Sequence, residues 1–413
     1  MALFVQKYGG SSLSDVSLIC SAAKLIANKK KAGNEVVVVV SAMGNTTTNL
    51  LNLAYKVSTV PPMRELDMLL TAGERISNSL LAIAVESFGI KACSFTGSQA
   101  GIITTNNHGS AKVINILTYP LFNSLNKGYV VLVAGYQGVS RCNPSVTTLG
   151  RGGSDTTAIT LAAVLNADIC EIYTDVNGVF TADPHVVSNS YHTKDVSSAE
   201  MLEMAYCGSR ILALSCLEYS RKYNVQIHIK SSHSSKTGTI IRNYFKNKPI
   251  KNSTFIGVAH NFEEIKVSII DLPSKPGSIS NLFRRLISSG VHINMALQNK
   301  SKIGTHKGNI TFTCPVSNYP LVIKILISLR KKIGFRHIVY SNHISKVSLV
   351  GLNIFSNASI AIKFYKALTE SGININLISI SKIRISASIK DTELKMAINI
   401  LHKIFVLNFN KSL

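Results

Sequence analysis

The segment LGRGGSDTTA places a fixed cation and a fixed anion in one glycine-rich loop. It runs from Leu149 to Ala158 and continues into a stretch with helical character. Glycine-rich turns ahead of helices often bind phosphate, but this one fits neither G-x-x-x-x-G-K-[ST] nor G-x-G-x-x-G. The guanidinium of Arg151 suits a carboxylate, whereas Asp155 repels phosphate and can instead orient lysines or an ammonium. The loop therefore predicts a zwitterionic or carboxylate substrate beside a phosphate donor.

Two further segments carry charges suited to the same chemistry. KYGGSS places Lys7 before Gly9 and Gly10, a point cation beside backbone N–H groups that can donate to phosphate oxygens. A surface lysine before a tight turn would show the same pattern. TAGERIS places Glu74 after a glycine. This residue is either an ordinary acid in the first turn of a helix or the group that receives a substrate ammonium.

Hydroxyl and aromatic side chains complete the set of candidate groups. SAMGNTTTNL supplies Ser41 and Thr47, which are also typical of helix N-caps. YTDVNGVFTADP combines turn-forming residues with Tyr173 and Phe180, and we expect it to surround a nucleotide.

The first 240 or so residues alternate between strand-like and helix-like segments. We expect strands at Phe4–Lys7, Val36–Ser41, Gly128–Ala134 and Ala167–Thr174, and helices at Val16–Lys30 and Thr156–Leu165. This alternation predicts a mostly parallel sheet covered on both faces. Ligands of such sheets collect at the loops that follow the carboxyl ends of the strands, which is where the informative loops lie.

The remainder of the chain contains an internal repeat. A basic, polar segment at Asn243–Ser253 is interrupted by proline and predicts a linker. Beyond it, similar segments start at Lys266 and Lys346, and each predicts strand, turn, amphipathic helix and strand. Further strands are expected at Asn309–Thr313 and Lys382–Ile389. Two copies favour a pair of βαββαβ units.

The bulk composition excludes several classes. The chain has 413 residues, enough for about two or three domains. Its seven cysteines are scattered without a C-x-x-C pair, so we expect neither a disulfide framework nor a zinc site. We expect no secretory signal, no membrane span and a cytoplasmic location. The net charge of +23 is spread out and increases toward the C-terminus. It indicates lysine-rich solvated surfaces rather than nucleic-acid binding, because no RNA-binding motif accompanies it.

Together these motifs resemble the bacterial aspartokinases, which belong to the amino-acid-kinase superfamily. KYGGSSLSD, TLGRGGSDTTA and YTDVNGVFTADP carry the resemblance, which covers nearly the whole chain. It implies an α/β fold with a doubly wound, mostly parallel sheet, followed by two ferredoxin-like ACT units. The implied boundaries are a catalytic domain at 1–245, a linker and a strand contributed to the ACT pair at 246–262, and ACT domains at 263–340 and 341–413. Because one ACT unit is inserted within the other in this family, the strand near Phe255–Ala259 is expected in the last unit.

The implied reaction transfers the γ-phosphoryl group of ATP to the side-chain carboxylate of L-aspartate. It opens lysine, threonine and methionine biosynthesis. A carboxylate nucleophile has a pKa of about 3.9 and needs no general base. Phosphoryl transfer then depends on alignment and on cations around the phosphoryl oxygens. Mg²⁺ is expected to arrive on ATP, with no protein ligand named.

The resemblance also implies roles for individual residues. The catalytic set is Lys7, Asp155 and Arg210. The aspartate-binding set is Ser41, Thr47, Glu74, Arg151, Gly152, Gly153 and Ser154. The nucleotide-binding set is Lys7, Tyr8, Gly9, Gly10, Tyr173, Thr174, Asp175, Val179, Phe180, Asp183 and Pro184. The regulatory set is Lys275, Gly277, Ser278, Ile279, Asn294, Gln298, Ser359, Ile360, Asn374, Ile375 and Ser381.

Three positions depart from the family pattern. Arg210 stands where close relatives often have lysine, and Ser274 where they often have aspartate. FSNASIAI lacks the Pro-Gly of the family's second effector loop. We therefore expect an ACT-paired homo-oligomer with weakened feedback by lysine, threonine or both.

Three alternatives stay open at this point. A kinase of N-acetylglutamate or glutamate would use the same sheet. A degenerate, non-catalytic amino-acid sensor would keep only the ACT pair's function. A nucleic-acid binder has net charge as its sole support.

Overall fold

The computed structural model describes residues 1–413 except 151, 235, 244–256, 274, 276, 301–306, 353, 355–357 and 408–413. The chain divides into two compact units. The first comprises Met1–Phe180, Tyr191–Tyr206 and Arg210–Ser253, and the second comprises Thr181–Ser190, Cys207–Ser209 and Thr254–Leu413. Thr181–Ser190 and Cys207–Ser209 lie inside the range predicted for the catalytic domain but belong to the second unit.

An eight-stranded sheet forms the centre of the first unit. Its strands, in sheet order, are β12 (Asp195–Ser197), β14 (Thr239–Arg242), β13 (Ile227–Ser231), β9 (Ile169–Thr174), β1 (Leu3–Tyr8), β2 (Glu35–Val40), β6 (Val130–Ala134) and β3 (Ala92–Phe95). All neighbouring strands are parallel except β13 and β14. The central strands are continuous apolar runs such as EVVVVV because both faces of the sheet are covered.

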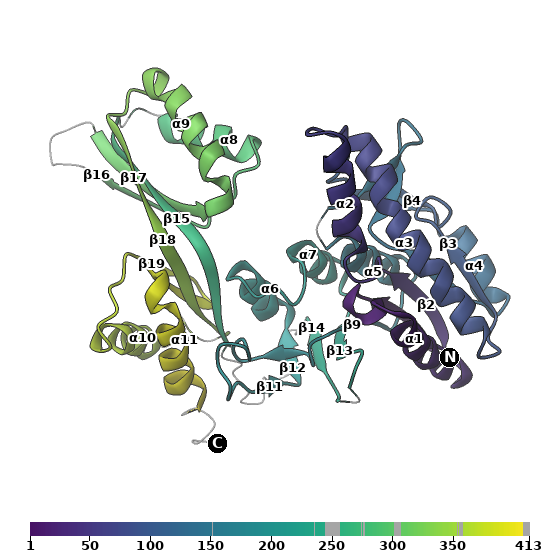
Figure 1. Cartoon of the computed structure of the whole chain (residues 1–413). Helices are drawn as coiled ribbons and strands as arrows, with labels where there is room; N and C mark the ends of the chain where they lie inside the picture. Colours follow the sequence, from purple (N-terminus) through teal and green to yellow (C-terminus); the bar gives the residue numbers. More distant parts are fainter. Residues whose placement is uncertain are drawn as a thin grey trace. The chain divides into compact units, whose positions relative to one another are not determined.

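Helices cover both faces of this sheet (Figure 1). The helices of this unit are α1 (Val16–Lys31), α2 (Thr46–Val57), α3 (Met63–Glu86), α4 (Tyr119–Asn126), α5 (Gly153–Val164), α6 (Ser198–Tyr206) and α7 (Leu214–Tyr223). Of these, α2 packs on α3, and α7 packs on α5 and α6. Apolar side chains of α1 and α3, such as Ile26 and Leu81, are buried with Val36, Val38 and Val40 of β2. Helix α5 is almost entirely buried and packs on β1, β2 and β9. The doubly wound, mostly parallel fold predicted from the sequence is confirmed.

Two smaller sheets complete the first unit. Four strands lie in the order β5 (Val113–Ile116), β4 (Ile102–Thr104), β7 (Gln137–Ser140) and β8 (Val146–Thr148). The second is the pair β10 (Val179–Phe180) and β11 (His192–Thr193). Strand β8 leads directly into the loop before α5, so the four-stranded sheet determines where that loop starts.

The second unit is built on one six-stranded sheet. Its strands, in sheet order, are β16 (Met295–Lys300), β17 (Lys307–Pro315), β15 (Gly257–Pro273), β18 (His337–Val350), β20 (Arg384–Lys390) and β19 (Leu377–Ile380). Helices α8 (Ser278–Ser288) and α9 (Tyr319–Ile333) pack on one half, and α10 (Ala358–Glu370) and α11 (Leu394–His402) on the other. The two repeats predicted from the sequence are thus halves of a single sheet.

The long strands β15 and β18 join the two halves. Gly257–Asn261 of β15 pairs with Lys346–Val350 of β18, whereas the later part of β15 pairs with β17 and with the start of β18. The first residues of β15 therefore lie in the half that carries the last repeat, which is the arrangement expected for an inserted unit. The predicted domain boundaries themselves stay a prediction.

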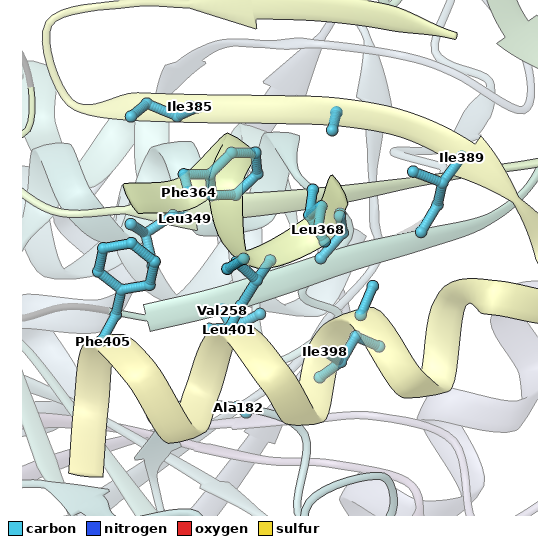
Figure 2. Packing of buried hydrophobic residues seen from close by; sticks show 14 of the residues in the cluster. Ala182, Val258, Leu349, Phe364, Leu368, Ile385, Ile389, Ile398, Leu401 and Phe405 are labelled. Atoms are coloured by element: carbon cyan, nitrogen blue, oxygen red, sulfur yellow. The ribbon is translucent and has the colours of Figure 1, made fainter. Parts of the chain in front are cut away.

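The core of the last repeat explains why Thr181–Ser190 belongs to the second unit. Figure 2 shows Phe364 and Leu368 of α10 pointing toward the side chains of α11 and the sheet. Ala182 and Val187 are buried in this same cluster. Thr181 is also fixed there, because its hydroxyl is 2.9 Å from His402 Nε2 and its carbonyl accepts from Val258 N at 2.7 Å.

Candidate active site

The carboxyl ends of five neighbouring parallel strands lie on one edge of the first unit's sheet. These strands, β13, β9, β1, β2 and β6, end at Ser231, Thr174, Tyr8, Val40 and Ala134. The loops that follow β1, β2 and β9 contain the segments KYGGSS, SAMGNTT and TDVNGVF. The structure therefore brings together, on one edge, motifs that lie up to about 170 residues apart in the sequence.

Lys7 and Asp155 meet at this edge. Lys7 Nζ lies 2.6 Å from Asp155 Oδ1, and the two side chains are 13% and 14% exposed. Lys7 lies near the end of β1, and Asp155 lies in the first turn of α5, where the helix dipole favours negative charge. The contact leaves the ammonium near the edge and holds it with a fixed counter-charge. The role of Asp155 in catalysis stays a prediction.

The glycines after β1 are used partly for packing. Gly9 N donates to Tyr173 O at 3.2 Å and thereby continues the pairing of β1 with β9. A Cβ on Gly10 would lie 2.7 Å from Ala42 O. The loops after β1 and β2 can therefore touch only because position 10 is glycine.

Glu74 lies in the middle of α3, not in a first helical turn, and is 4% exposed. Its Oε1 accepts from Ala42 N at 3.4 Å. Its Oε2 is buried and has no hydrogen-bond partner among the described residues. Burial raises the pKa of this carboxyl to about 7, although backbone hydrogen bonds oppose the shift. An unpaired buried carboxylate oxygen is well suited to receive a cation.

The other predicted aspartate-binding residues surround this region. Ser41 follows β2, and its carbonyl accepts from Ser77 Oγ of α3 at 2.7 Å. Thr47 lies half-buried in the first turn of α2. Ser154 is buried in the first turn of α5, and its hydroxyl would lie 2.8 Å from a Cβ on Gly135, the residue after β6. These contacts connect the loops after β2 and β6 to α3 and α5.

The loop before α5 needs glycine for its conformation. Gly152 has a φ of 70° and would place a Cβ 2.2 Å from Ala213 Cβ. Gly153 is buried and begins α5. Arg151 lies outside the described residues, so its assignment to the aspartate carboxylate stays a prediction. Arg210 is exposed in the segment between α6 and α7. No contact that joins it to Lys7 or Asp155 is present among the described residues.

Several residues predicted to bind the nucleotide lie at or after the ends of β1 and β9 and contact other residues of the first unit. Tyr8 and Tyr173 stack with ring centroids 4.6 Å apart, and Thr174 Oγ1 donates to Asp175 Oδ1 at 3.0 Å. Val179 N donates to Thr239 Oγ1 at 2.8 Å, so this buried residue has a clear role in holding β10.

The remaining nucleotide candidates have local partners of their own. Phe180 packs edge-on against His192 with centroids 5.7 Å apart. Asp183 and Pro184 belong to the second unit, where Asp183 Oδ1 accepts from His185 N at 2.9 Å. Their contact with a nucleotide stays a prediction.

Four of the predicted regulatory residues line one cavity of about 280 Å³ in the second unit. They are Lys275, Gly277, Ile279 and Gln298, and the wall is completed by Leu272, Pro273, Gly308 and Ile310. Ser278 begins α8 beside this cavity. Asn294 has a different partner, because its Nδ2 donates to the buried Glu264 Oε1 at 2.9 Å. Glu264 in turn lies 3.5 Å from Lys346 Nζ.

The corresponding residues of the second repeat have mainly structural contacts. Ile360 and Ile375 pack against the buried cluster of α10 and α11. Ser381 forms a turn, with its N donating to Arg384 O at 2.8 Å. Ser359 and Asn374 are exposed. Ser274 lies outside the described residues.

Sequence reasoning missed two buried polar clusters in the first unit. Glu171 of β9 accepts from Lys230 at 2.8 Å, Gln6 at 2.7 Å and Tyr173 at 3.2 Å. Burial acts to raise the pKa of Glu171, but the contacts with Lys230 and Gln6 and the charge of Lys29 outweigh it, so the net shift is downward. The second cluster surrounds Asp67 of α3. The sequence offered one signal for Asp67, because this acid falls among the positions that form the buried face of α3.

Comparisons with known proteins match both parts of the chain. A model of the amino acid kinase family matches residues 2–231, and an ACT domain model matches residues 347–405. The aspartokinase of Mycolicibacterium smegmatis is 55% identical over 405 residues, which cover 98% of this chain and 96% of that protein. The chain belongs to the aspartokinases of the amino acid kinase family. The aspartokinase of Mycobacterium tuberculosis H37Rv is 52% identical with the same coverage.

Solved structures show the same fold over the whole chain. Escherichia coli aspartokinase III has a TM-score of 0.82 at 21% identity and covers 98% of this chain and 99% of its own. The aspartate kinase of Synechocystis has a TM-score of 0.55 at 34% identity and covers 98% of this chain and 69% of its own. The chain is accordingly a kinase with a catalytic amino acid kinase fold and a C-terminal ACT region.

Metal-binding clusters and membrane-spanning helices are both absent from the described part of the chain. Its residues contain no group of three or more His, Cys, Asp or Glu side chains arranged to hold a metal ion. Within the same residues, no helix is both long enough and apolar enough to span a membrane.

Proposed function

We propose that this aspartokinase transfers the γ-phosphoryl group of ATP to the β-carboxylate of L-aspartate, giving 4-phospho-L-aspartate and ADP. A carboxylate oxygen forms the new bond to the γ-phosphorus, and the bond from that phosphorus to the bridging oxygen of ADP breaks. The carboxylate is already ionised near neutral pH and no proton moves. The observation that supports this most directly is the contact between Lys7 and Asp155, 2.6 Å apart at the edge where the loops after β1, β2 and β9 gather.

Lys7 stabilises the transferring phosphoryl in this proposal. Two anions must approach each other, so neutralising the equatorial oxygens is the main task of the protein. Asp155 keeps the ammonium directed along the edge. Mg²⁺ bound to ATP would supply further positive charge on the phosphates. The edge fits this, because the ammonium of Lys7, which lies 2.6 Å from Asp155 Oδ1, would add its charge to that of the metal.

Glu74 and Arg151 select the substrate. The unpaired Oε2 of Glu74 receives the α-ammonium of aspartate, and Arg151 takes the α-carboxylate in a bidentate contact. N-acetylglutamate has no ammonium, so Glu74 would face an amide instead. Two-point recognition of this kind positions the reacting β-carboxylate without contacting it.

Two related structures support the choice of ligands. Escherichia coli aspartokinase III has been solved with aspartate and ADP, and in another state with lysine and aspartate. We propose that lysine, threonine or both inhibit this chain as well, within a homo-oligomer that pairs through the ACT regions. Feedback is weakened in this proposal because Ser274 stands where relatives often carry aspartate and because FSNASIAI lacks the Pro-Gly of the second effector loop.

An ADP-release assay with MgATP tests the assignment. L-aspartate should be turned over and N-acetylglutamate should not. Equal turnover of the two substrates would remove the roles of Glu74 and Arg151. The same assay with millimolar lysine and threonine tests feedback, and inhibition as sharp as in a fully regulated aspartokinase would contradict the weakened-control proposal.

A further inference from the structure

Asp67 is a fully buried carboxylate that the proposed mechanism does not use. It lies in the second turn of α3 and is 1% exposed. Burying a carboxylate is costly unless hydrogen bonds replace the water it loses. Its partners are His108 Nδ1 at 2.7 Å, Thr148 Oγ1 at 2.6 Å and Gly109 N at 3.1 and 3.2 Å from the two oxygens. All three partners belong to other segments of the first unit, so Asp67 joins pieces of chain rather than capping its own helix.

The partners lie immediately beside the loop that precedes α5. Thr148 is the last residue of β8, and we term the segment between β8 and α5, of which the structure describes Leu149, Gly150 and Gly152, the aspartate loop. His108 and Gly109 belong to the segment 105–110 between β4 and β5, which we term the neighbouring loop. The two loops touch, because a Cβ on Gly150 would lie 3.3 Å from Gly109 O. Ala111 N also donates to Thr148 O at 2.9 Å.

Asp67 and Glu74 lie on the same side of one rigid helix. They are seven residues apart, close to two helical turns, and both side chains are buried. The charges of both carboxylates act on the phenol of Tyr136. Burial raises the pKa of its phenol most, the hydrogen bond with Thr148 lowers it, and the charges of Glu74 and Asp67 raise it. Helix α3 thus carries both the group that would bind the substrate ammonium and the group that holds the start of the aspartate loop.

We propose that Asp67 is a positioning residue for aspartate: it fixes the aspartate loop relative to Glu74 through Thr148 and the neighbouring loop. The inference rests on the proposed roles of Glu74 and Arg151. Recognition at two points requires the spacing between the two groups to be correct before the substrate arrives. Asp67 holds the start of the aspartate loop in place relative to Glu74, because the hydroxyl of Thr148 is hydrogen-bonded to a helix that also bears Glu74. ATP does not depend on this spacing.

Asp67→Asn is the primary test, measured by steady-state kinetics well below the melting temperature. The amide keeps the volume of the carboxylate but turns a donor toward one of its donor partners. We expect KM for aspartate to rise about 10- to 100-fold, the order carried by hydrogen bonds to a charged group. KM for ATP should change less than about 2-fold, because the loops after β1 and β9 have no contact with Asp67 in this scheme. Asp168→Asn is the matched control. Asp168 is exposed and accepts from Leu3 N at 2.8 Å, so its variant should leave both KM values unchanged.

Smaller variants separate positioning from folding. Thr148→Val removes one hydroxyl donor and should raise KM for aspartate in the same direction as Asp67→Asn. His108→Asn keeps an N–H donor near the place of Nδ1 and should preserve KM, whereas His108→Ala should raise it. The double variant Asp67→Asn with Thr148→Val should raise KM for aspartate by less than the product of the two single increases, because both substitutions break the same contact.

The outcomes distinguish this inference from the proposed function. If Glu74→Gln raises KM for aspartate and Asp67→Asn lowers only the melting temperature, Asp67 is structural and the inference is wrong. If neither variant changes KM for aspartate, the proposed substrate site itself is wrong. Should Asp67→Asn fail to fold, unchanged aspartate KM values in both Thr148→Val and His108→Ala would overturn the inference.

Discussion

Two carboxylates near the same sheet edge are kept in opposite electrostatic conditions. Asp155 lies in the first turn of α5 with a lysine ammonium 2.6 Å away. Glu74 lies inside α3 with one oxygen buried and unpaired among the described residues, and burial raises its pKa to about 7. The contrast suggests a different cation as the partner of each carboxylate. Asp155 already holds the protein's own cation, whereas Glu74 has an oxygen left for the cation that, in our proposal, arrives with the substrate.

Replacing the protein's cation should have the largest effect. Lys7→Ala is expected to lower kcat by about 10²–10³, roughly 2.7–4 kcal/mol, which is typical when one transition-state contact is removed. KM for aspartate should change much less, because the charge acts where negative charge develops. Steady-state kinetics with MgATP measures both. A change confined to KM would contradict the role of Lys7, and Lys24→Ala, which alters a lysine on α1, is the control.

The stability of the ligand-free enzyme should depend on pH through Glu74. Its pKa is about 7 in the folded state against an ordinary value of 4.5, so the folded state binds the proton more tightly than the unfolded chain. The contribution of Glu74 to stability is most favourable below pH 4.5 and is lost as the pH rises through 7. The loss is about 3 kcal/mol at 1.36 kcal/mol per pKa unit.

Glu74→Gln should remove this dependence. Denaturant unfolding of the wild type and the variant between pH 5 and 8 should show the variant gaining relative stability as the pH rises. Saturating aspartate should narrow the gap at pH 8, because its ammonium compensates the buried charge. Parallel pH profiles of the two proteins would show that Glu74 is not desolvated in solution.

Glu74→Gln also tests the contrast between the two carboxylates by steady-state kinetics. Glu74→Gln is expected to raise KM for aspartate about 10- to 100-fold, since a charge-assisted contact is lost. The effect on kcat should be smaller than that of Lys7→Ala, because the ammonium does not react. Lys7→Ala should therefore change mainly kcat, and Glu74→Gln mainly KM for aspartate. Exchanged phenotypes would show that the two carboxylates have been assigned to the wrong cations.

The smallest effect is expected in the second unit. Lys275 lines the cavity of about 280 Å³ and is exposed to solvent. Exposed charges contribute little, on the order of 0–1 kcal/mol. Lys275→Ala should thus raise the lysine or threonine concentration needed for half-inhibition by only about 2- to 5-fold. Inhibition curves give this value, and kcat without effector should be unchanged. A gain in inhibition would show that the cavity attracts a cation instead.

Strand and helix positions in the first unit follow closely from sequence patterns. The apolar run Val36–Val40 predicted a strand, and β2 spans Glu35–Val40. The expected helix at Val16–Lys30 corresponds to α1, Val16–Lys31. Such runs are informative because a strand buried on both faces must be apolar throughout. The helix before Leu165 begins three residues earlier than expected, at Gly153, because Gly152 can adopt a positive φ and end the loop there.

The polar clusters could not be predicted in the same way. Asp67 and Glu74 look like ordinary acids on an amphipathic helix, and only their burial separates them from exposed acids such as Glu65. Their partners lie about 32 to 81 residues away in the sequence, in loops whose approach depends on the packing of two sheets. Local patterns carry no information about such distances.

The sequence by itself determined the family, the alternation of strands and helices, and the residues at the ends of the strands, because each follows from local periodicity and from motif order. Tertiary structure alone decided what those residues face. It paired Lys7 with Asp155, used Gly9 N for the sheet, left one oxygen of Glu74 unpaired among the described residues and enclosed Asp67 with three donors. The reason is that charge, burial and hydrogen bonding at a site are properties of segments brought together from distant parts of the chain.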